Sequence, residues 1–154
     1  MAFVTGASMV VSRAFYERVG PMREDYFLYY EEVDWALRRG DLPLVYCEGA
    51  LIYHRAGTAI GSPTVERMAS ALSIYFKHRS RMMFLRRFFP ASLPLGYAYS
   101  LAKAAQLLVK GYPREAMALL RAVHSLGPPP EVRRRLSPEA AVLAFGTGKK
   151  RGSS

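Results

Sequence analysis

A helical pattern that runs from Thr64 to Phe89 and stops at Pro90 constrains the fold of this chain more than any other feature. Apolar side chains recur in it at the spacing that places them on one face of a helix. They are Met68, Leu72, Tyr75, Phe76, Met82, Met83 and Phe89. Proline cannot continue a helix, because it lacks the N–H and its ring clashes with the preceding turn. The pattern therefore predicts one long helix that ends before residue 90.

Shorter helices are expected after this one. Residues 94–110 and 113–125 show helical patterns, and the run Pro128–Pro130 then interrupts the chain. A further short helix is expected after Ser137-Pro138, because serine is a good N-cap and proline is tolerated in the first turn. The second half of the chain is thus predicted to be helical.

The first part of the chain predicts strands as well as helices. Residues 3–12, 42–47 and 50–55 are rich in the apolar, β-branched and aromatic side chains typical of strands. Between them, Ser12 is placed to cap a helix over RAFYERV. The segment EEVDWALRRG carries acids at its start and arginines at its end, as the helix dipole favours. The expected fold class is α+β, with the single cysteine, Cys47, buried in a strand.

Three segments are expected from composition. Residues 1–63 hold the strands, residues 64–127 form a basic helical part, and residues 128–154 contain a proline break, a short helix and a disordered tail. The N-terminus lacks the pattern of a signal peptide. The stretch 88–109 is long enough to span a membrane, but its prolines and Lys103 favour a membrane-surface or core helix.

Charge is distributed unevenly along the chain. Residues 1–66 hold nine acids and six bases, whereas residues 67–114 hold nine bases and no acid. Such a basic part favours an anionic partner: nucleic acid, acidic lipid or a phosphorylated substrate. Nucleic acid is disfavoured, because no recognisable motif is present and aromatic residues gather in the acidic half.

Three segments of the first half carry a resemblance to a known family. GASMVVSRAFYERVG, DYFLYYEEVDWALRRG and LPLVYCEGALIYHRAG follow one another in an order that resembles inverting family 2 glycosyltransferases, above all the bacterial rhamnosyltransferase-type members. The resemblance covers residues 3–57 and extends to the basic helix at 75–90. It implies the C-terminal, acceptor-side part of a GT-A-type nucleotide-diphospho-sugar transferase fold, followed by basic amphipathic helices.

The resemblance also implies a reaction and roles for residues. Glu32 occupies the position of the general base, which takes the proton of the acceptor hydroxyl as the sugar is transferred with inversion. The family often has Asp at this position, so Glu is a departure, and Glu31 would orient it. Asp34 would orient the acceptor or pair with Arg38 four residues later.

Three of these residues are expected to bind the acceptor: Trp35, Tyr29 and Arg38. Trp35 suits stacking on a sugar face, although a tryptophan is also commonly a core residue. The aromatic run around Tyr29 is expected to form an apolar plug under a loop, with one tyrosine in the acceptor cleft.

His54 matches the position that completes metal coordination in the family, which implies Mn²⁺ or Mg²⁺ in the complete enzyme. The family's nucleotide-binding half, with its Asp-x-Asp motif, has no counterpart in this sequence. We therefore expect a fragment or one half of a split protein, inactive alone and not holding the metal by itself. Its donor is expected to be a nucleotide-diphospho-sugar, with rhamnose as the favoured sugar. Its acceptor is expected to be a glycan or a lipid-linked acceptor.

The basic helix predicts an acidic membrane surface as a further partner. Its expected anion-binding residues are Lys77, Arg79, Arg81, Arg86 and Arg87. Cations near an acidic bilayer each contribute about 1 kcal/mol to binding. The expected location is cytoplasmic, at the inner face of the bacterial plasma membrane. The alternative to a transferase is a non-catalytic module that binds a membrane surface or a separate nucleotide-binding half.

Overall fold

The structure is a computed structural model of the 154-residue chain, and it describes residues 6–54 and 68–146. Every regular element in these ranges is helical. The elements are α1 (Arg13–Val19), η1 (Glu24–Tyr26), α2 (Glu31–Leu37), α3 (Ala71–Phe88), η2 (Pro90–Ser92), α4 (Leu93–Val109), α5 (Pro113–Val123), α6 (Pro130–Arg133) and α7 (Pro138–Phe145).

The expected α+β fold is wrong for the part of the chain that the structure describes. Residues 6–12 and 42–54 contain no strand, so the expected acceptor-side portion of a GT-A-type sheet does not form there. Strands are held by hydrogen bonds to a neighbouring strand, and two isolated segments of this length are only marginally stable as a hairpin. Apolar side chains that would line a sheet instead face solvent, with Val45 77% and Tyr53 90% exposed. Residues 3–5 and 55 of the expected strands lie outside the described residues.

The helices follow the sequence closely. The long helix begins later than expected, at Ala71, because the Ser70 hydroxyl accepts a hydrogen bond from the Ser73 N–H at 3.2 Å and caps it. It ends at Phe88, before Pro90, as predicted. The predictions for α4, α5 and α7 are confirmed to within two residues. Residues 64–67 of the expected helix, the loop 56–63 and the tail from residue 147 lie outside the described residues.

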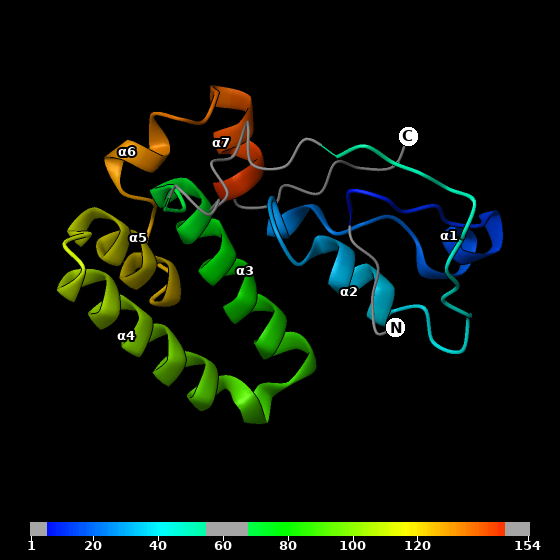
Figure 1. The fold of residues 1–154 in the computed structure, drawn as a ribbon, viewed down its shortest axis with the longest axis horizontal. Coiled ribbons are helices and arrows are strands. Elements are labelled where there is room, and N and C mark those ends of the chain that lie inside the picture. Colours follow the sequence, from blue (N-terminus) through cyan, green and yellow to red (C-terminus); the bar gives the residue numbers. More distant parts are fainter. Residues whose placement is uncertain (1–5, 55–67, 147–154) are drawn as a thin grey trace.

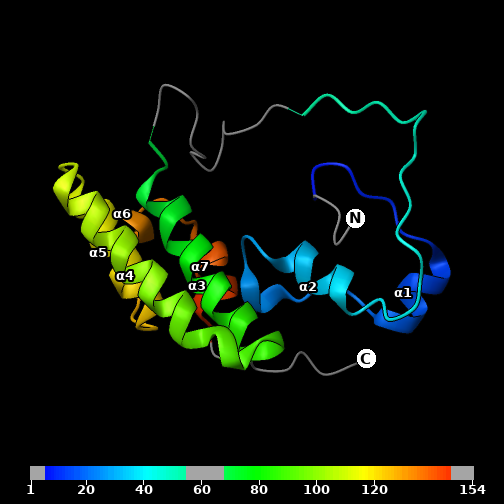
Figure 2. The same cartoon turned by 60° about the horizontal axis from the view of Figure 1, so that its bottom comes forward.

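Helices α3, α4 and α5 lie side by side and form one side of the molecule (Figures 1 and 2). The short turn η2 reverses the chain between α3 and α4. A buried cluster fills the space between the three helices, comprising Ile74, Met82, Ala104, Leu107, Ala116, Leu119 and Val123. Gly96 allows α4 to approach α3 closely, since a Cβ there would collide with Leu85 Cδ1.

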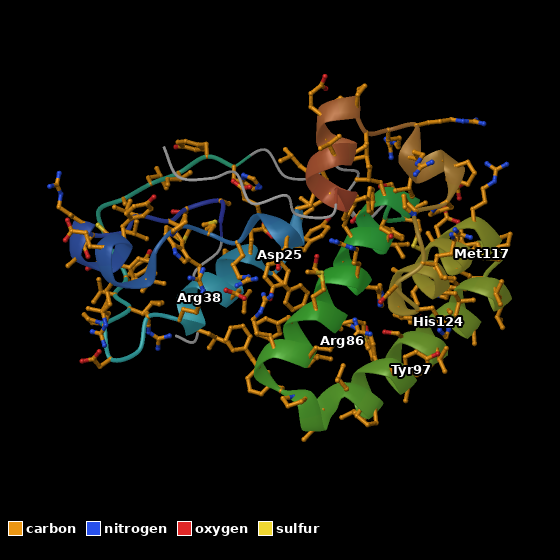
Figure 3. The ribbon with its side chains drawn as sticks, turned by 180° about the vertical axis from the view of Figure 1, so that it is seen from behind. Asp25, Arg38, Arg86, Tyr97, Met117 and His124 are labelled. Atoms are coloured by element: carbon orange, nitrogen blue, oxygen red, sulfur yellow. The ribbon has the colours of Figure 1, made fainter. Side chains whose placement is uncertain are left out.

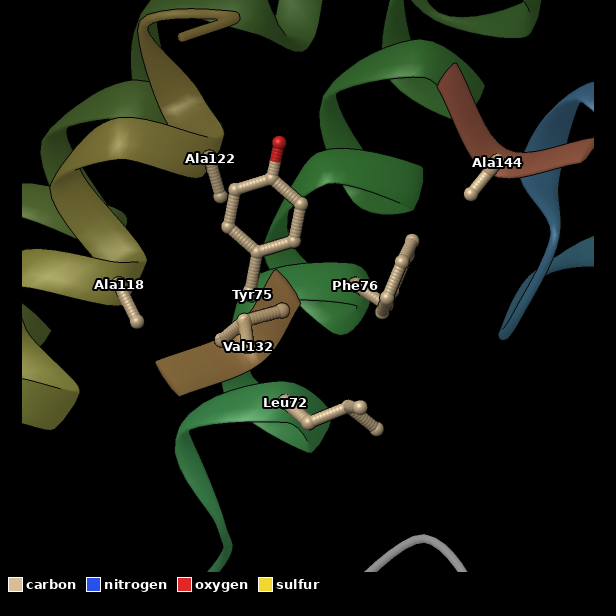
Figure 4. Close-up of a cluster of buried hydrophobic side chains, with 7 residues drawn as sticks. All are labelled: Leu72, Tyr75, Phe76, Ala118, Ala122, Val132 and Ala144. Atoms are coloured by element: carbon tan, nitrogen blue, oxygen red, sulfur yellow. The ribbon is translucent and has the colours of Figure 1, made fainter. Parts of the chain in front are cut away.

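A second buried cluster joins α3 and α5 to the C-terminal helices (Figure 4). Tyr75 and Phe76 of α3 contact Val132 of α6 and Ala144 of α7 within it. The Tyr75 hydroxyl donates to the Leu126 carbonyl at 2.8 Å, which fixes the chain just after α5. Helices α6 and α7 therefore cover the α3–α5 pair.

The first two helices lie on the other side of α3 from α4 and α5 (Figure 1). Ser12 caps α1 as predicted, accepting a hydrogen bond from the Phe15 N–H at 3.1 Å. Gly20 ends α1 with a φ of 76°, a conformation that glycine adopts without strain. No helix in the described ranges combines the length and the apolar character that a bilayer crossing requires.

Candidate functional site

The candidate site is the start of α2, whose position depends on the hydrogen bonds of Asp34. This side chain is completely buried. Its Oδ1 accepts from Arg38 Nε at 2.7 Å, which confirms the predicted pair, and its Oδ2 accepts from the Tyr26 hydroxyl and from Arg87, each at 2.9 Å. A buried carboxylate is tolerated when it is paired and hydrogen-bonded in this way. With these three donors, Asp34 holds α2 in place.

The arginines that bind Asp34 connect α2 to both of its neighbours. Arg38 also donates to the carbonyls of Val19 at 2.8 Å and Pro21 at 3.0 Å, at the end of α1. Arg87 of α3 also binds Asp25 at 3.1 Å. Burial would raise the pKa of Asp25, but hydrogen bonds from Arg23 and Arg87 outweigh it and hold the pKa below its ordinary value. Figure 3 shows Asp25 and Arg38 at this junction.

The loop that leads into α2 has an unusual backbone. Phe27, Tyr29 and Tyr30 have φ values of 64°, 66° and 72°, although they are not glycines. Bulky residues in the left-handed region carry strain that the surrounding structure must offset. Helix α3 does so: Ser80 Oγ donates to the Leu28 carbonyl at 2.8 Å, and the Tyr30 ring lies 5.2 Å from that of Phe84.

This loop delivers two adjacent carboxylates to the helix start. One oxygen of each, Oε2 of Glu31 and Oε2 of Glu32, is buried and has no hydrogen-bond partner among the described residues. Burial raises the pKa of Glu31, and the neighbouring charge of Glu32 acts in the same direction. A buried carboxylate oxygen without a donor costs free energy. A ligand hydroxyl that donated to it would remove that cost.

The expected acceptor residues Trp35 and Tyr29 both have partners inside the protein. Trp35 is buried, donates from Nε1 to the Gly20 carbonyl at 2.8 Å, and contacts Phe15 edge-on at a centroid distance of 4.9 Å. The Tyr29 hydroxyl lies 2.7 Å from Ser73 Oγ. One edge of Trp35 borders an apolar cavity of about 270 Å³ between residues 9–12 and 42–45. These two segments are among those that the sequence predicted as strands.

The expected metal ligand His54 is exposed at the end of the segment 42–54. Nowhere in the described ranges do three His, Cys, Asp or Glu side chains come together as a metal site requires. The described residues thus do not fit a metal ion by themselves, and no step is derived through one. Cys47 is exposed, so its expected burial is wrong, because the strand that would have buried it does not form.

The five expected anion-binding residues of α3 divide into two groups. Arg79 donates to the carbonyls of Asp25, at 3.1 Å, and Ala144, also at 3.1 Å, and Arg87 binds Asp25 and Asp34. Arg79 and Arg87 therefore connect α3 to η1, α2 and α7. Lys77 and Arg86 are exposed, and Arg81 is half-buried.

Sequence reasoning missed the environment of His78. It is buried, its Nδ1 lies 3.1 Å from Ser100 Oγ of α4, and it lines a cavity together with Lys77, Arg81 and Lys103. The only available signal was its place on the apolar face of α3, four residues before Met82. His124 also has a partner, since its Nε2 lies 2.9 Å from the Tyr97 hydroxyl (Figure 3).

Comparison of the chain with models of protein families, with curated proteins and with solved structures returned no match.

Proposed function

We propose that this chain supplies the acceptor-side carboxylates of an inverting sugar transferase. The observation that carries the proposal is the pair of buried oxygens, Glu31 Oε2 and Glu32 Oε2, which lack a donor among the described residues. An acceptor hydroxyl would donate to this pair and lose its proton to Glu32 as the glycosidic bond forms. Glu31 would orient the base. This assignment rests on the local chemistry and on the motif resemblance, not on the fold.

The donor and the metal are assigned to a separate nucleotide-binding half. A nucleotide-diphospho-sugar is held in this family with the help of a metal ion, and no group of three potential metal ligands occurs among the described residues. Mn²⁺ or Mg²⁺ held by that half would neutralise the leaving diphosphate. His54, which is exposed, remains the residue proposed to reach the metal from this chain in the complete enzyme.

The exposed apolar segments support the existence of such a half. Leu51, Val45 and Tyr53 present large apolar side chains to solvent along residues 42–54. Contiguous apolar surface of this kind is typical of interaction sites. An edge strand of the nucleotide-binding half would cover these side chains and fill the cavity beside Trp35.

The test compares Glu32→Gln and Glu31→Gln with Glu24→Gln, which removes the same charge from an exposed position in η1. The full chain is combined with a nucleotide-binding half from a bacterial rhamnosyltransferase, and sugar transfer to a glycan acceptor is measured. General-base catalysis contributes about 10²- to 10⁴-fold to rate, so Glu32→Gln should lose transfer by that factor. Glu31→Gln should lose less, and Glu24→Gln should retain full activity.

Saturation-transfer NMR of the chain alone with the same glycan gives a second readout. We expect weaker binding in both site variants and unchanged binding in Glu24→Gln. Wild-type transfer rates in Glu32→Gln, or identical glycan binding in all variants, would overturn the proposal.

A second candidate, a membrane-surface module, is favoured by the outer face of α4. Eight exposed residues of this helix are apolar and extend over four turns: Pro94, Leu95, Ala98, Leu101, Ala102, Ala105, Leu108 and Val109. The other exposed residues of α4 are Tyr99, Lys103 and Gln106. The eight apolar positions recur at helical spacing and define a single stripe, here called the α4 stripe.

Lys103 and Lys110 lie along one edge of the α4 stripe, and residues 67–114 contain no acid. An apolar stripe bordered by cations is typical of helices that lie in the surface of an acidic bilayer. Such a surface agrees with a cytoplasmic position at the inner leaflet.

Vesicle flotation tests the second candidate. The double variant Leu101→Gln with Leu108→Gln should abolish binding of the full chain to vesicles of phosphatidylcholine and phosphatidylglycerol. Met117→Gln removes an equally exposed apolar side chain from α5 and should bind as the parent does. Binding should weaken as salt rises, because surface charge is screened. Equal flotation of the parent chain, the double variant and Met117→Gln would show that the α4 stripe does not bind the membrane.

A further inference from the structure

A cavity of about 490 Å³ opens between α3, α4 and α5, beside the α4 stripe. Its polar lining includes Lys77, His78 and Arg81 from α3 and Tyr99 and Lys103 from α4, together with Tyr29 and Ser73. Its inner wall is apolar and includes Leu119 of the buried three-helix cluster. The site is thus basic at its mouth and apolar inside.

Among the described residues, the three cations at this mouth have no carboxylate opposite them. No acidic residue within residues 6–54 and 68–146 lines the cavity, and the ion pairs formed within these ranges leave Lys77, Arg81 and Lys103 out. Lys103 donates only to a neutral group there, Gln106 Oε1, at 2.7 Å. Arg81 is held in position, because its guanidinium lies 4.5 Å from the centre of the Tyr99 ring and its Nε donates to the Tyr30 hydroxyl at 3.2 Å. That arrangement directs a planar, charged group with further N–H donors toward the cavity.

The pKa of His78 depends on the charges of the same three cations. Ser100 Oγ donates to the Gly96 carbonyl at 2.9 Å, so it accepts from His78 Nδ1, which fixes the neutral tautomer with hydrogen on Nδ1. Burial, together with the positive charges of Arg81, Lys77 and Lys103, lowers the pKa of His78 from 6.5 to about 3. An anion bound among these cations would reverse part of that effect.

We propose that this cavity binds the phosphate group of a phosphomonoester lipid headgroup at the membrane surface. A dianionic phosphate matches three cations that form no ion pair among the described residues, and an arginine guanidinium binds two phosphate oxygens at once. The lipid source follows from position, since Tyr99 and Lys103 border both the cavity and the α4 stripe. The inference rests on the membrane-surface candidate and gives it a ligand.

The first arm of the test measures selectivity between vesicles. The full chain is titrated with phosphatidylcholine vesicles that contain either phosphatidic acid or phosphatidylglycerol, adjusted to equal surface potential. We expect tighter binding to phosphatidic acid by about fivefold or more, as one additional charge contact near the surface would give. Arg81→Gln and Lys103→Gln should reduce this preference to unity. Lys110→Gln removes the same charge outside the cavity and should keep the preference.

The second arm uses inorganic phosphate without lipid. The His78 ring signals are followed by NMR as phosphate replaces chloride at constant ionic strength. We expect His78 to shift and to titrate at higher pH in phosphate, and this response should vanish in Lys103→Gln but persist in Lys110→Gln. Because the α4 double variant leaves the cavity intact, it should lose vesicle binding and retain the phosphate response.

The outcomes separate the possible failures. A phosphate response without any preference for phosphatidic acid would overturn the lipid source and leave a site for free phosphate. Equal behaviour of Lys103→Gln and Lys110→Gln in both arms would overturn the site itself. Undiminished flotation of the α4 double variant would overturn the membrane candidate and, with it, the lipid source, even if the phosphate response is retained.

Discussion

Asp34 shows how one side chain can have both a local and a long-range role. The sequence places it four residues before Arg38, where a surface pair is expected, and the structure adds Tyr26 and Arg87 from elsewhere in the chain. Its complete burial makes these contacts matter for stability. Both oxygens of this carboxylate already accept hydrogen bonds from donors inside the protein, so its effect on any ligand is exerted through the position of α2.

Asp34→Asn should therefore destabilise the protein. The amide keeps the shape but leaves Arg38 and Arg87 without their anion, which costs about 2 to 3 kcal/mol. Urea denaturation at neutral pH measures the change. Asp41→Asn is the control, because Asp41 pairs with Arg18 on the surface, and no measurable change is expected there. If the Asp34→Asn protein is as stable as the control, the stabilising role assigned to Asp34 is wrong.

His78 gives the molecule a pH dependence of known sign. The unfolded chain protonates this ring near pH 6.5, whereas the folded chain does so at about 3. Between these values the unfolded state binds more protons, so the contribution of His78 to stability is full above pH 6.5 and is lost as the pH falls toward 3. His78→Asn should flatten the stability profile in that window. Thermal unfolding in phosphate-free buffers measures it, and an unchanged slope would contradict the burial of a neutral ring.

At the scale of elements, α5 depends on small residues. Ala116, Ala118 and Ala122 are buried and are divided between the two apolar clusters. Ala116 belongs to the cluster shared with α3 and α4, whereas Ala118 and Ala122 belong to the cluster shared with α3, α6 and α7. Such contacts require side chains that let the helix axes approach. Sequence periodicity located α5, but it did not reveal that two clusters divide its buried face.

Ala118→Leu should overfill the space between α3, α5 and α6. Overpacking of a buried site costs about 1 to 3 kcal/mol. Chemical denaturation compares this variant with Met117→Leu on the neighbouring exposed position (Figure 3), which should change little. Equal stability of the two variants would mean that the cluster around Val132 has room to spare.

The elements also show where sequence reasoning failed. Helix ends depend on groups close in sequence, such as the caps Ser12 and Ser137 and the proline at 90. Strands depend on a neighbour that may be distant in sequence. Residues 42–47 have strand composition, yet no neighbour pairs with them among the described residues. That difference explains why the helix predictions were confirmed and the α+β class was wrong.

At the scale of the whole molecule, α3 connects its two sides. One face contributes to the clusters shared with α4 and α5, while Arg79, Ser80 and Arg87 hold η1, the strained loop and α2. The start of α2 is therefore positioned by contacts more than 40 residues away in the sequence. Weakening these contacts of α3 should displace the candidate carboxylates Glu31 and Glu32 without unfolding α4 and α5.

Arg87→Gln tests this connection. It removes contacts to Asp25 and Asp34, so amide exchange in η1 and α2 should accelerate by about tenfold, equivalent to about 1.4 kcal/mol of local stability. Exchange in α4 and α5 should not change. The adjacent Arg86→Gln is the control, because Arg86 is exposed and donates to Ser125 Oγ at 3.4 Å, away from η1 and α2. Uniform acceleration in every helix would show instead that the molecule opens as one unit.

The sequence by itself determined five of the helices, the end of α3, the excess of positive charge in the second half and the adjacent carboxylates at positions 31 and 32, because each depends on neighbouring residues. The five helices are α1, α2, α4, α5 and α7. The start of α3 at Ala71 and the short helix α6 were not predicted. Tertiary structure alone decided which cations are used internally. Arg79 and Arg87 turn to carbonyls and carboxylates of the first part of the chain, while Lys77, Arg81 and Lys103 gather at one cavity. A linear charge count cannot separate these groups, because a cation's role depends on whether folding brings an acceptor within hydrogen-bond distance.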